Sequence, residues 1–258
     1  MGEAIAITSG KGGVGKSSVC INIGMSLSQM GYKVCLIDVD LGLKNLDIML
    51  GLENRVIYDL KDVMEGKCSL HQAMIKDKHE DNLYLLPACK TIHIQYFKGE
   101  ELKMIVDKLI QSFDYVLLDT PAGIEKGFVD AIACVKRAIL VSTLDITALQ
   151  DADRVIGILL KEGLEHLSFV INRMNTKYIE KGISVSLEEA KEYLAIDFLG
   201  YIFDDENMMR ANNHGRPITL QRESILYSCF QAITKRMLGE RAILPKYKEK
   251  TILQKLFG

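Results

Sequence analysis

Short apolar runs alternate along the chain with stretches in which apolar residues recur at helical spacing. Strands that alternate with helices in this way indicate βαβ units. The chain is therefore predicted to be an α/β protein, with a doubly wound, mainly parallel sheet flanked by helices. The apolar runs have the length of buried strands, and they lie at Ala4–Thr8, Val34–Ile37, Leu83–Leu86, Tyr115–Leu118, Ala138–Val141, Ser168–Ile171 and Phe198–Ile202. The helical spacing is clearest at Glu100–Ser112, Leu149–Glu162 and Ser186–Leu194.

The pattern shows no internal repeat, low-complexity tract or proline-rich linker. A chain of 258 residues with 48% hydrophobic residues is long enough for one α/β domain with a sizeable core. We expect this domain to span residues 1–244, and a separate amphipathic helix to span residues 245–258. No signal peptide precedes the first strand, and no apolar run approaches the length of a membrane span, which predicts a cytoplasmic protein.

A glycine-rich turn, residues 10–18 (GKGGVGKSS), follows the first strand and precedes a largely apolar stretch that predicts a buried helix. The phosphate-loop pattern is fitted by Gly10, Gly15, Lys16 and Ser17. Backbone N–H groups converge in such a turn, and the dipole of the following helix favours negative charge. We expect Lys16 to reach the β- and γ-phosphates of ATP and Ser17 to bind Mg²⁺. The nucleotide-binding residues of the turn are predicted to be Gly10, Lys11, Gly12, Gly13, Val14, Gly15, Lys16, Ser17 and Ser18.

A carboxylate ends the predicted strand Tyr115–Leu118. Asp119 comes directly after this apolar run, which is where phosphate-loop proteins place a carboxylate that helps to hold Mg²⁺ through water. Residues 120–123 (TPAG) follow as a tight loop that could sense the γ-phosphate. Asp119 is thus the second predicted magnesium residue.

Two more carboxylates, Asp38 and Asp40, follow the predicted strand Val34–Ile37. On an extended backbone, residues two apart share one side, so both side chains can face the phosphates. The alternative is that they are turn aspartates that cap residues 41–46.

Two later segments are candidates for recognising the base. Asn172 and Arg173 end the strand Ser168–Ile171, where an amide can bond the edge of an adenine. Residues 202–217 (IFDDENMMRANNHGRP) carry Asp205 and also Phe203, an aromatic side chain that can stack on adenine or belong to the core.

The end of the chain has a composition of its own. Residues 246–258 contain four lysines and one glutamate, a local charge of +3 against −2 for the whole chain. After Pro245, which can start a helix, the apolar residues fall within one helical arc. A basic amphipathic helix predicts an interfacial membrane segment, whereas the alternative is a terminal helix that docks on its own core. The membrane residues are predicted to be Lys248, Lys250, Ile252, Leu253, Lys255, Leu256 and Phe257.

Charge and cysteine content narrow the possible partners. With a net charge of −2 and an isoelectric point near 6.2, the chain has no overall attraction to nucleic acid or membrane. Its six cysteines form no CxxC pair, which argues against a metal or iron–sulfur role. Cys20, Cys35, Cys134 and Cys229 lie in apolar runs and are expected to be reduced core thiols.

The turn KGGVGKS resembles the deviant Walker A family of P-loop ATPases, in which K-G-G-V-G-K-[ST] replaces the ordinary loop. The resemblance implies a nucleotide-sandwich dimer in which Lys11 crosses the interface to the ATP of the partner. It also implies that Asp38 supports Mg²⁺ and that Asp40 positions the attacking water. The family's adenine contact falls on Asn172, while its I-P-E-D segment is here Ile202-Phe203-Asp204-Asp205.

The similarity extends over nearly the whole chain to the MinD branch of this family, including residues 56–78 (VIYDLKDVMEGKCSLHQAMIKDK). The resemblance implies a Mg-ATPase that dimerises with ATP on the cytoplasmic face of the plasma membrane. Such an ATPase positions the division septum by recruiting the inhibitor MinC to the membrane. The ATPase is released from the membrane when ATP is hydrolysed. MinE or another topological regulator would stimulate hydrolysis. Asp151 and Asp153 match the family's contacts to MinC.

Three other functions are found in proteins with this fold and remain as alternatives. A ParA-type DNA-segregation ATPase needs a basic surface, which Lys and Arg at 235, 236, 241, 246, 248 and 250 could supply. A flagellar-number ATPase similar to MinD usually carries an extra segment before the first strand. A metal-cluster carrier or small-molecule ligase is the third reading, and the missing CxxC pairs oppose the carrier.

Overall fold

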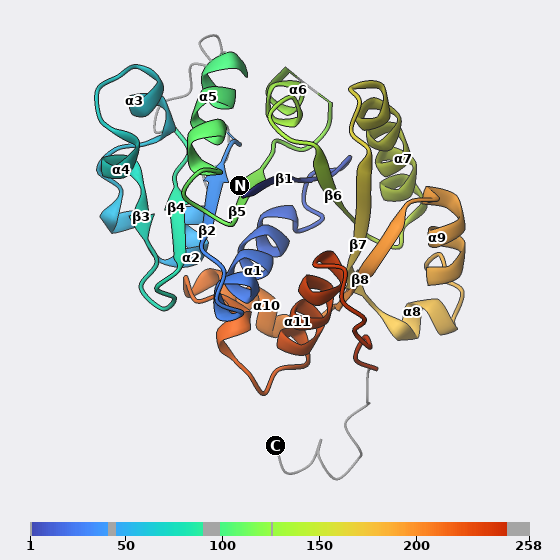
Figure 1. Cartoon of the computed structure of the whole chain (residues 1–258). Helices are drawn as coiled ribbons and strands as arrows, with labels where there is room; N and C mark the ends of the chain where they lie inside the picture. Colours follow the sequence, from blue (N-terminus) through green and yellow to red (C-terminus); the bar gives the residue numbers. More distant parts are fainter. Residues whose placement is uncertain (1, 41–44, 90–98, 125, 247–258) are drawn as a thin grey trace.

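The computed structural model of the chain describes residues 2–40, 45–89, 99–124 and 126–246. Its centre is an eight-stranded sheet with the order β3-β4-β2-β5-β1-β6-β7-β8 (Figure 1). Neighbouring strands run parallel except β3, which pairs antiparallel with β4. The strands are β1 (Glu3–Thr8), β2 (Val34–Asp38), β3 (Ile75–Lys76), β4 (Leu83–Leu86), β5 (Tyr115–Asp119), β6 (Arg137–Ser142), β7 (His166–Met174) and β8 (Asp197–Phe203).

Helices cover both faces of the sheet (Figure 1). The helices α1, α10 and α11 lie on one side of the sheet, and α5, α6 and α7 lie on the other. This is the doubly wound arrangement that the alternating pattern predicted. The helices are α1 (Lys16–Gln29), α2 (Leu46–Leu50), α3 (Leu60–Met64), α4 (Leu70–Ala73), α5 (Gly99–Leu109), α6 (Lys126–Ile132), α7 (Ile146–Lys161), α8 (Thr176–Glu180), α9 (Leu187–Leu194), α10 (Glu206–Asn213) and α11 (Ile225–Met237).

The core lies on both faces of the central strands. Every residue of β2 is buried, as are the apolar residues of β5 beyond Tyr115. Helix α1 is buried nearly all round, including Ile21, Ile23 and Leu27. A helix enclosed in this way needs apolar residues on every side, which explains why its sequence lacks a polar face.

All seven expected strands are present, as are the helix after the glycine-rich turn and the three helices expected from helical spacing, with their ends shifted by a few residues. The expected fold class is therefore confirmed. The two-residue strand β3 was not expected, because it is too short to show a period. The predicted amphipathic helix at residues 245–258 lies almost wholly outside the described residues. In the part that is described, no helix is long and apolar enough to cross a bilayer.

Candidate functional site

The turn after β1 is shaped by two close approaches. A Cβ atom on Gly10 would lie 2.3 Å from the carbonyl oxygen of Asp151, so the turn abuts the backbone of α7. Gly15 has a φ of +91°, and a Cβ atom there would lie 2.2 Å from Nδ2 of Asn172. Both positions therefore require glycine, the second also because its backbone is left-handed. Helix α1 begins at Lys16, directly after the turn, so its N-terminus faces the same space.

A buried ion pair lies under this turn. Nζ of Lys16 donates to Oδ1 of Asp119 at 2.7 Å, and the two side chains are 7% and 1% exposed. Burial alone would lower the pKa of the Lys16 ammonium, but the charge of Asp119, its hydrogen bond and the charge of Asp40 raise it instead. The lysine therefore stays charged at the start of α1, beside the carboxylate that ends β5.

Asp38 adds a second buried carboxylate to the ion pair. It pairs in register with Asp119 across β2 and β5, and its side chain accepts hydrogen bonds from the backbone N–H groups of Asp40, Asn45 and Leu46. Burial, and then the charge of Asp119, raise the pKa of Asp38 to about 8, although the N–H groups of Asn45 and Leu46 act the other way. One lysine thus does not compensate both carboxylates, and the arrangement favours a further cation.

The oxygen atoms of these carboxylates fit Mg²⁺, which prefers oxygen ligands and keeps several waters. Oδ2 of Asp119 is buried and has no hydrogen-bond partner in the described part of the chain. Burial raises the pKa of Asp119, while Lys16 and the hydroxyl of Ser17 lower it, so Ser17 belongs to the same cluster. Ser17 and the two carboxylates are therefore the residues that would hold Mg²⁺ beside a bound phosphate.

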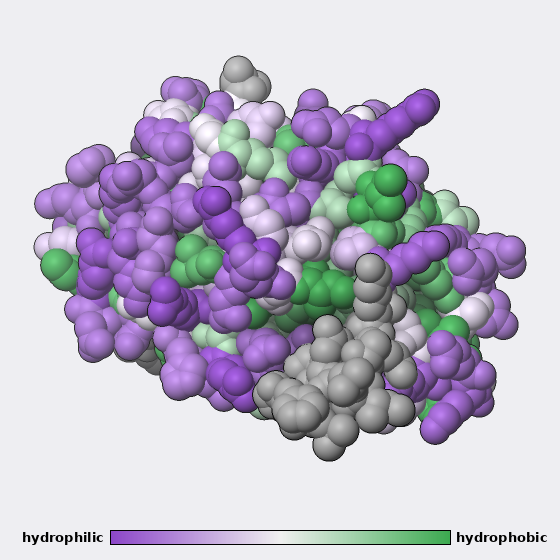
Figure 2. Space-filling view, turned by 90° about the horizontal axis from the view of Figure 1, so that it is seen from below, coloured by the Kyte–Doolittle hydropathy of each residue, from purple (hydrophilic) through white to green (hydrophobic). Residues whose placement is uncertain are grey.

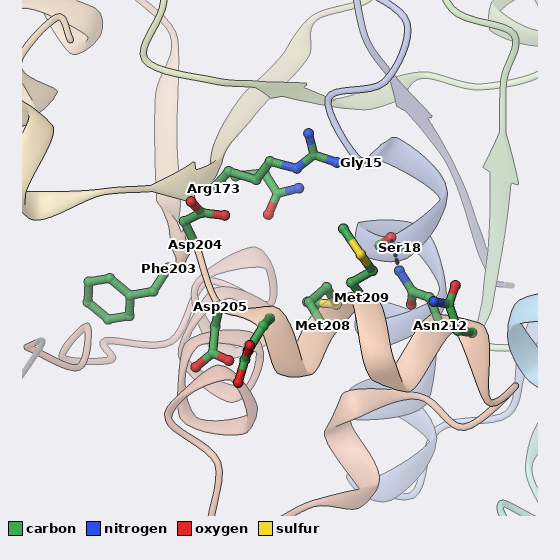
Figure 3. A pocket seen from close by; sticks show the side chains of 12 residues that line it. Gly15, Ser18, Arg173, Phe203, Asp204, Asp205, Met208, Met209 and Asn212 are labelled. Atoms are coloured by element: carbon green, nitrogen blue, oxygen red, sulfur yellow. Dashed lines mark hydrogen bonds between the residues drawn. The ribbon is translucent and has the colours of Figure 1, made fainter. Parts of the chain in front are cut away.

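Beside the turn lies a cavity of about 580 Å³ (Figure 3). Gly15 and Ser18 line it on the side of α1, and Met208, Met209 and Asn212 of α10 line the opposite side. The remaining lining residues are Asn172, Arg173, Phe203, Asp204, Asp205, Glu206 and Asn213. Volume and mixed lining suit the base and ribose of a nucleotide whose phosphates lie on the turn.

The orientation of the Asn172 amide favours an amino group on the ligand. Its Nδ2 donates to the carbonyl oxygen of Val14 at 2.7 Å, and a carbonyl can only accept, which fixes the amide. One N–H of Nδ2 is used in this bond, and Oδ1 is available to a ligand as an acceptor, which suits N6 of adenine but not O6 of guanine. Asn172 is 4% exposed, so this preference is held firmly.

Other residues expected at the base have different local roles. Arg173 adopts a left-handed backbone with φ of +53°, and its side chain extends across the top of the cavity (Figure 3). Asp205 caps α10 by accepting from the N–H of Asn207 at 2.8 Å. The ring of Phe203 points away from the cavity and packs on Tyr201, with centroids 5.2 Å apart. Phe203 is therefore a core residue, and the structure does not support its stacking on adenine.

Lys11 lies outside the phosphate site of its own chain. Its Nζ donates to Oγ1 of Thr147 at 2.9 Å and contacts Oδ1 of Asp145 at 3.4 Å, at the start of α7. The side chains of Lys11 and Asp145 are 46% and 49% exposed. An ion pair this exposed is worth about 1 kcal/mol or less, so little free energy holds the lysine in place.

The two aspartates expected to face a partner both lie on α7. Asp153 is exposed, and Asp151 forms an exposed contact of 3.5 Å with Arg154. Because the backbone of Asp151 abuts Gly10, this helix touches the phosphate turn directly. A partner bound on α7 would therefore contact a helix that itself touches the turn.

No group of three or more His, Cys, Asp or Glu side chains within the described ranges is arranged to hold a metal ion by itself. The six cysteines are free thiols, and all but Cys68 are buried. Burial raises the pKa of Cys35, Cys134 and Cys229 to about 12, so these thiols behave as core residues, as expected.

Comparison with known proteins agrees with this site. Residues 1–238 match the model of the ParA family, described as NUBPL iron-transfer P-loop NTPase. The septum site-determining protein MinD of Bacillus subtilis (strain 168) is 45% identical over 251 residues, which cover 96% of this chain and 94% of the relative. The chain belongs to the MinD family. Within the ParA group of P-loop NTPases, MinD proteins determine the septum site in cell division.

Solved MinD structures agree in fold. MinD in the MinC:MinD cell division complex of Aquifex aeolicus has a TM-score of 0.89 and 37% identity, with 95% of this chain and 99% of that chain covered. MinD of Pyrococcus horikoshii, solved with Mg-ADP, has a TM-score of 0.81 and 28% identity, with 92% and 96% covered. The family uses ATP and Mg²⁺, so the expected family, fold and cofactors are confirmed.

Several residues of the site were not predicted. Asp145 and Thr147, which hold Lys11, lie far from it in sequence, and Asn212 on α10 bonds Ser18 across 194 residues. Nothing in the chain links such positions before folding. A weaker signal was available for Asp145, since an aspartate just before an apolar helical pattern is a typical N-cap.

Proposed function

We propose that this chain is a Mg-dependent ATPase that dimerises with ATP, binds the cytoplasmic face of the plasma membrane, recruits MinC to position the division septum, and leaves the membrane after hydrolysis. Lys16 and the N–H groups of the turn bind the phosphates, and Ser17, Asp38 and Asp119 hold Mg²⁺. Asp40 orients the attacking water. Asn172, with Arg173 and Asp205 nearby, recognises adenine.

The position of Lys11 is the observation that carries the proposal. Its ammonium contacts Asp145 and Thr147 instead of the buried cluster of Lys16 and Asp119. A lysine at the tip of the phosphate turn, half exposed and weakly held, is available to the nucleotide of a second copy. There it would neutralise charge that develops on the phosphates, as an arginine finger does. Dimerisation and hydrolysis would then depend on the same residue.

Membrane binding is proposed for residues 245–258, with the lysines and apolar residues named above. The described chain leads to this segment along the edge strand β8, where the hydroxyl of Tyr201 donates to the carbonyl oxygen of Pro245 at 3.0 Å. The underside of the molecule is largely hydrophilic, with apolar groups gathered near its middle (Figure 2). Two such segments on one dimer bind a bilayer far more tightly than one, through effective concentration, which would make recruitment depend on ATP.

Partner binding is proposed for the outer face of α7, which carries Asp151 and Asp153. MinD of Aquifex aeolicus forms a complex with MinC, and its 37% identity to this chain makes MinC the expected partner. MinE, or another topological regulator, is proposed to stimulate hydrolysis. Because α7 abuts Gly10, a protein bound there can act on the phosphate turn.

Sedimentation with anionic liposomes tests the proposal. Three proteins are compared with ATP, ADP or no nucleotide: the full chain, a chain that ends at Leu244, and the full chain with Lys16→Ala as a nucleotide-free control. We expect only the full chain with ATP to pellet. Pelleting without regard to nucleotide would contradict ATP-driven recruitment. Absence of pelleting together with salt-sensitive DNA binding would instead favour a segregation ATPase.

A further inference from the structure

A buried polar network fastens α10 and the segment after it to helix α1. Asn22 of α1 donates through Nδ2 to the carbonyl oxygen of Ser18 at 2.8 Å. Its Oδ1 accepts from the N–H of Thr219 at 3.1 Å and from its hydroxyl at 2.9 Å. Asn22 and Thr219 are both 0% exposed. A network whose buried members are paired holds its elements in one arrangement.

One further hydrogen bond extends this network to the cavity. Nδ2 of Asn212, in the last turn of α10, donates to Oγ of Ser18 at 2.9 Å (dashed in Figure 3). Ser18 stands in the first turn of α1 and is the last residue of the glycine-rich phosphate motif. The bond therefore joins the helix that carries the phosphate site to the helix on the far side of the cavity.

Helix α10 presents two methionines to that cavity. Met208 and Met209 lie between Arg173 and Asn212 in Figure 3, and both line the space. Met209 is 67% exposed, which is high for an apolar side chain. Thioethers are polarizable and adapt their shape, and they make favourable contacts with flat rings. Met208, which is partly buried against the core, and the exposed Met209 thus form a wall suited to the face of a purine.

We propose that Asn212 is a positioning residue for the purine base. By donating to Ser18 it holds the wall of Met208 and Met209 at a fixed distance from the Asn172 amide, so that a base fits between them. In this bond the Ser18 oxygen accepts, so its hydroxyl hydrogen remains available, and Lys16 and Ser17 are untouched. Asn212 therefore affects the contact to the base and not the contact to the phosphates. This inference rests on the proposed nucleotide binding.

The test compares two ligands that share the phosphates and differ in the base. Calorimetry measures the affinity of the full chain, Asn212→Ala and Arg210→Ala for ATP and for inorganic tripolyphosphate, each with Mg²⁺. Arg210 is the matched control, because it lies on the same helix, is exposed and does not line the cavity. We expect Asn212→Ala to weaken ATP binding about tenfold, as for one lost hydrogen bond with its ordering effect, and to leave the affinity for tripolyphosphate unchanged. Arg210→Ala should bind both ligands as the unaltered chain does.

Ser18→Ala and the double variant complete the test. If the hydrogen bond acts as proposed, Asn212→Ala causes no further loss of ATP binding once Ser18 has been replaced, so the double variant binds as Ser18→Ala does. Unchanged ATP binding by Asn212→Ala, an equal loss for both ligands, or additive losses would each overturn the proposal. If the unaltered chain binds no ATP, the proposed function itself fails, and the two failures are thereby distinguished.

Discussion

The charge balance around Asp119 rests on one side chain. Asp38 and Asp119 are buried next to each other, and Lys16 is the cation that pairs with Asp119 at 2.7 Å. The pKa of Asp38, raised to about 8 by burial and by Asp119, reflects how poorly a second negative charge is tolerated there. A bound Mg²⁺ would relieve this repulsion, and phosphate would in turn meet Lys16 and the cation together.

Replacing Lys16 with alanine should abolish nucleotide binding. Removal of one partner from a buried ion pair costs about 3–5 kcal/mol, so the variant should also unfold at a lower denaturant concentration. Calorimetry with Mg-ATP and urea unfolding measure the two effects. Lys33→Ala is the control, since Lys33 is exposed and lies over the ring of Phe113, away from the turn. Binding by Lys16→Ala within about threefold of the unaltered chain would contradict the assigned role.

Residues of the phosphate site were predictable where they are consecutive or follow a strand. Gly10 to Ser18 form one motif, and Asp38, Asp119 and Asn172 each come at or just after the end of an apolar run. The carboxyl ends of parallel strands meet at one edge of a sheet, so these residues had to converge. The hydrogen bonds from Asn172 to Val14 and from Asn212 to Ser18 span 158 and 194 residues. Only the packing of whole elements creates such contacts.

At the scale of elements, the start of α7 combines a helix cap with the contact to Lys11. Asp145 is the N-cap, and its carboxylate accepts from the N–H of Ala148 and from the hydroxyls of Thr143 and Thr147. Burial raises the pKa of Asp145, but these hydrogen bonds and the charge of Lys11 outweigh it and lower the pKa to about 2. The ionised form is therefore the one that caps the helix.

Asp145→Ala should destabilise the folded chain by about 1 kcal/mol at pH 7, the usual value for a lost cap. Because the folded pKa lies below the unfolded value, this stability is present above pH 4 and is lost as pH falls toward 2. The difference in unfolding free energy between the two proteins should thus shrink with acid, as measured by urea unfolding at several pH values. Asp153→Ala, an exposed change on the same helix, should differ little at any pH. A pH-independent difference would contradict this account.

Helices and strands could be predicted from the sequence where their buried residues follow one another or recur at a regular spacing. The strands are buried on both faces and appear as plain apolar runs, and α7 has a clear apolar stripe. Helix α10 was missed because Ala211 is its only buried residue, so its sequence shows little period. The short helix α4 offered another signal, because Ser69 and Gln72 form a capping box that can be recognised from residue types alone.

At the scale of the whole molecule, the sheet order brings most residues of the proposed phosphate site together within one chain. Strand β5 lies between β2 and β1, which brings Asp38, Asp119 and the phosphate turn together within one chain. Lys11 is the exception, since it points to the start of α7. The proposed trans role of Lys11 predicts that Lys11→Ala loses dimerisation and hydrolysis while the monomer still binds ATP. Asp40→Ala should form an ATP dimer that hydrolyses poorly.

Mixing these two variants separates action in trans from action in cis. In a mixed dimer, the ATP bound by the Lys11→Ala protomer keeps Asp40 of that protomer and receives Lys11 from the partner, so one of the two sites is complete. If Lys11 acted within its own chain, neither site would be complete. We therefore expect phosphate release by the mixture to exceed the sum of the separate variants, with mixed dimers detected through a tag on one protomer. As control, Asp40→Ala mixed with the double variant Lys11→Ala/Asp40→Ala holds no complete site and should stay inactive. Mixed dimers that form without any gain in hydrolysis would rule out the trans lysine. With a trans lysine, the site on the Lys11→Ala protomer would contain every proposed residue and should hydrolyse ATP.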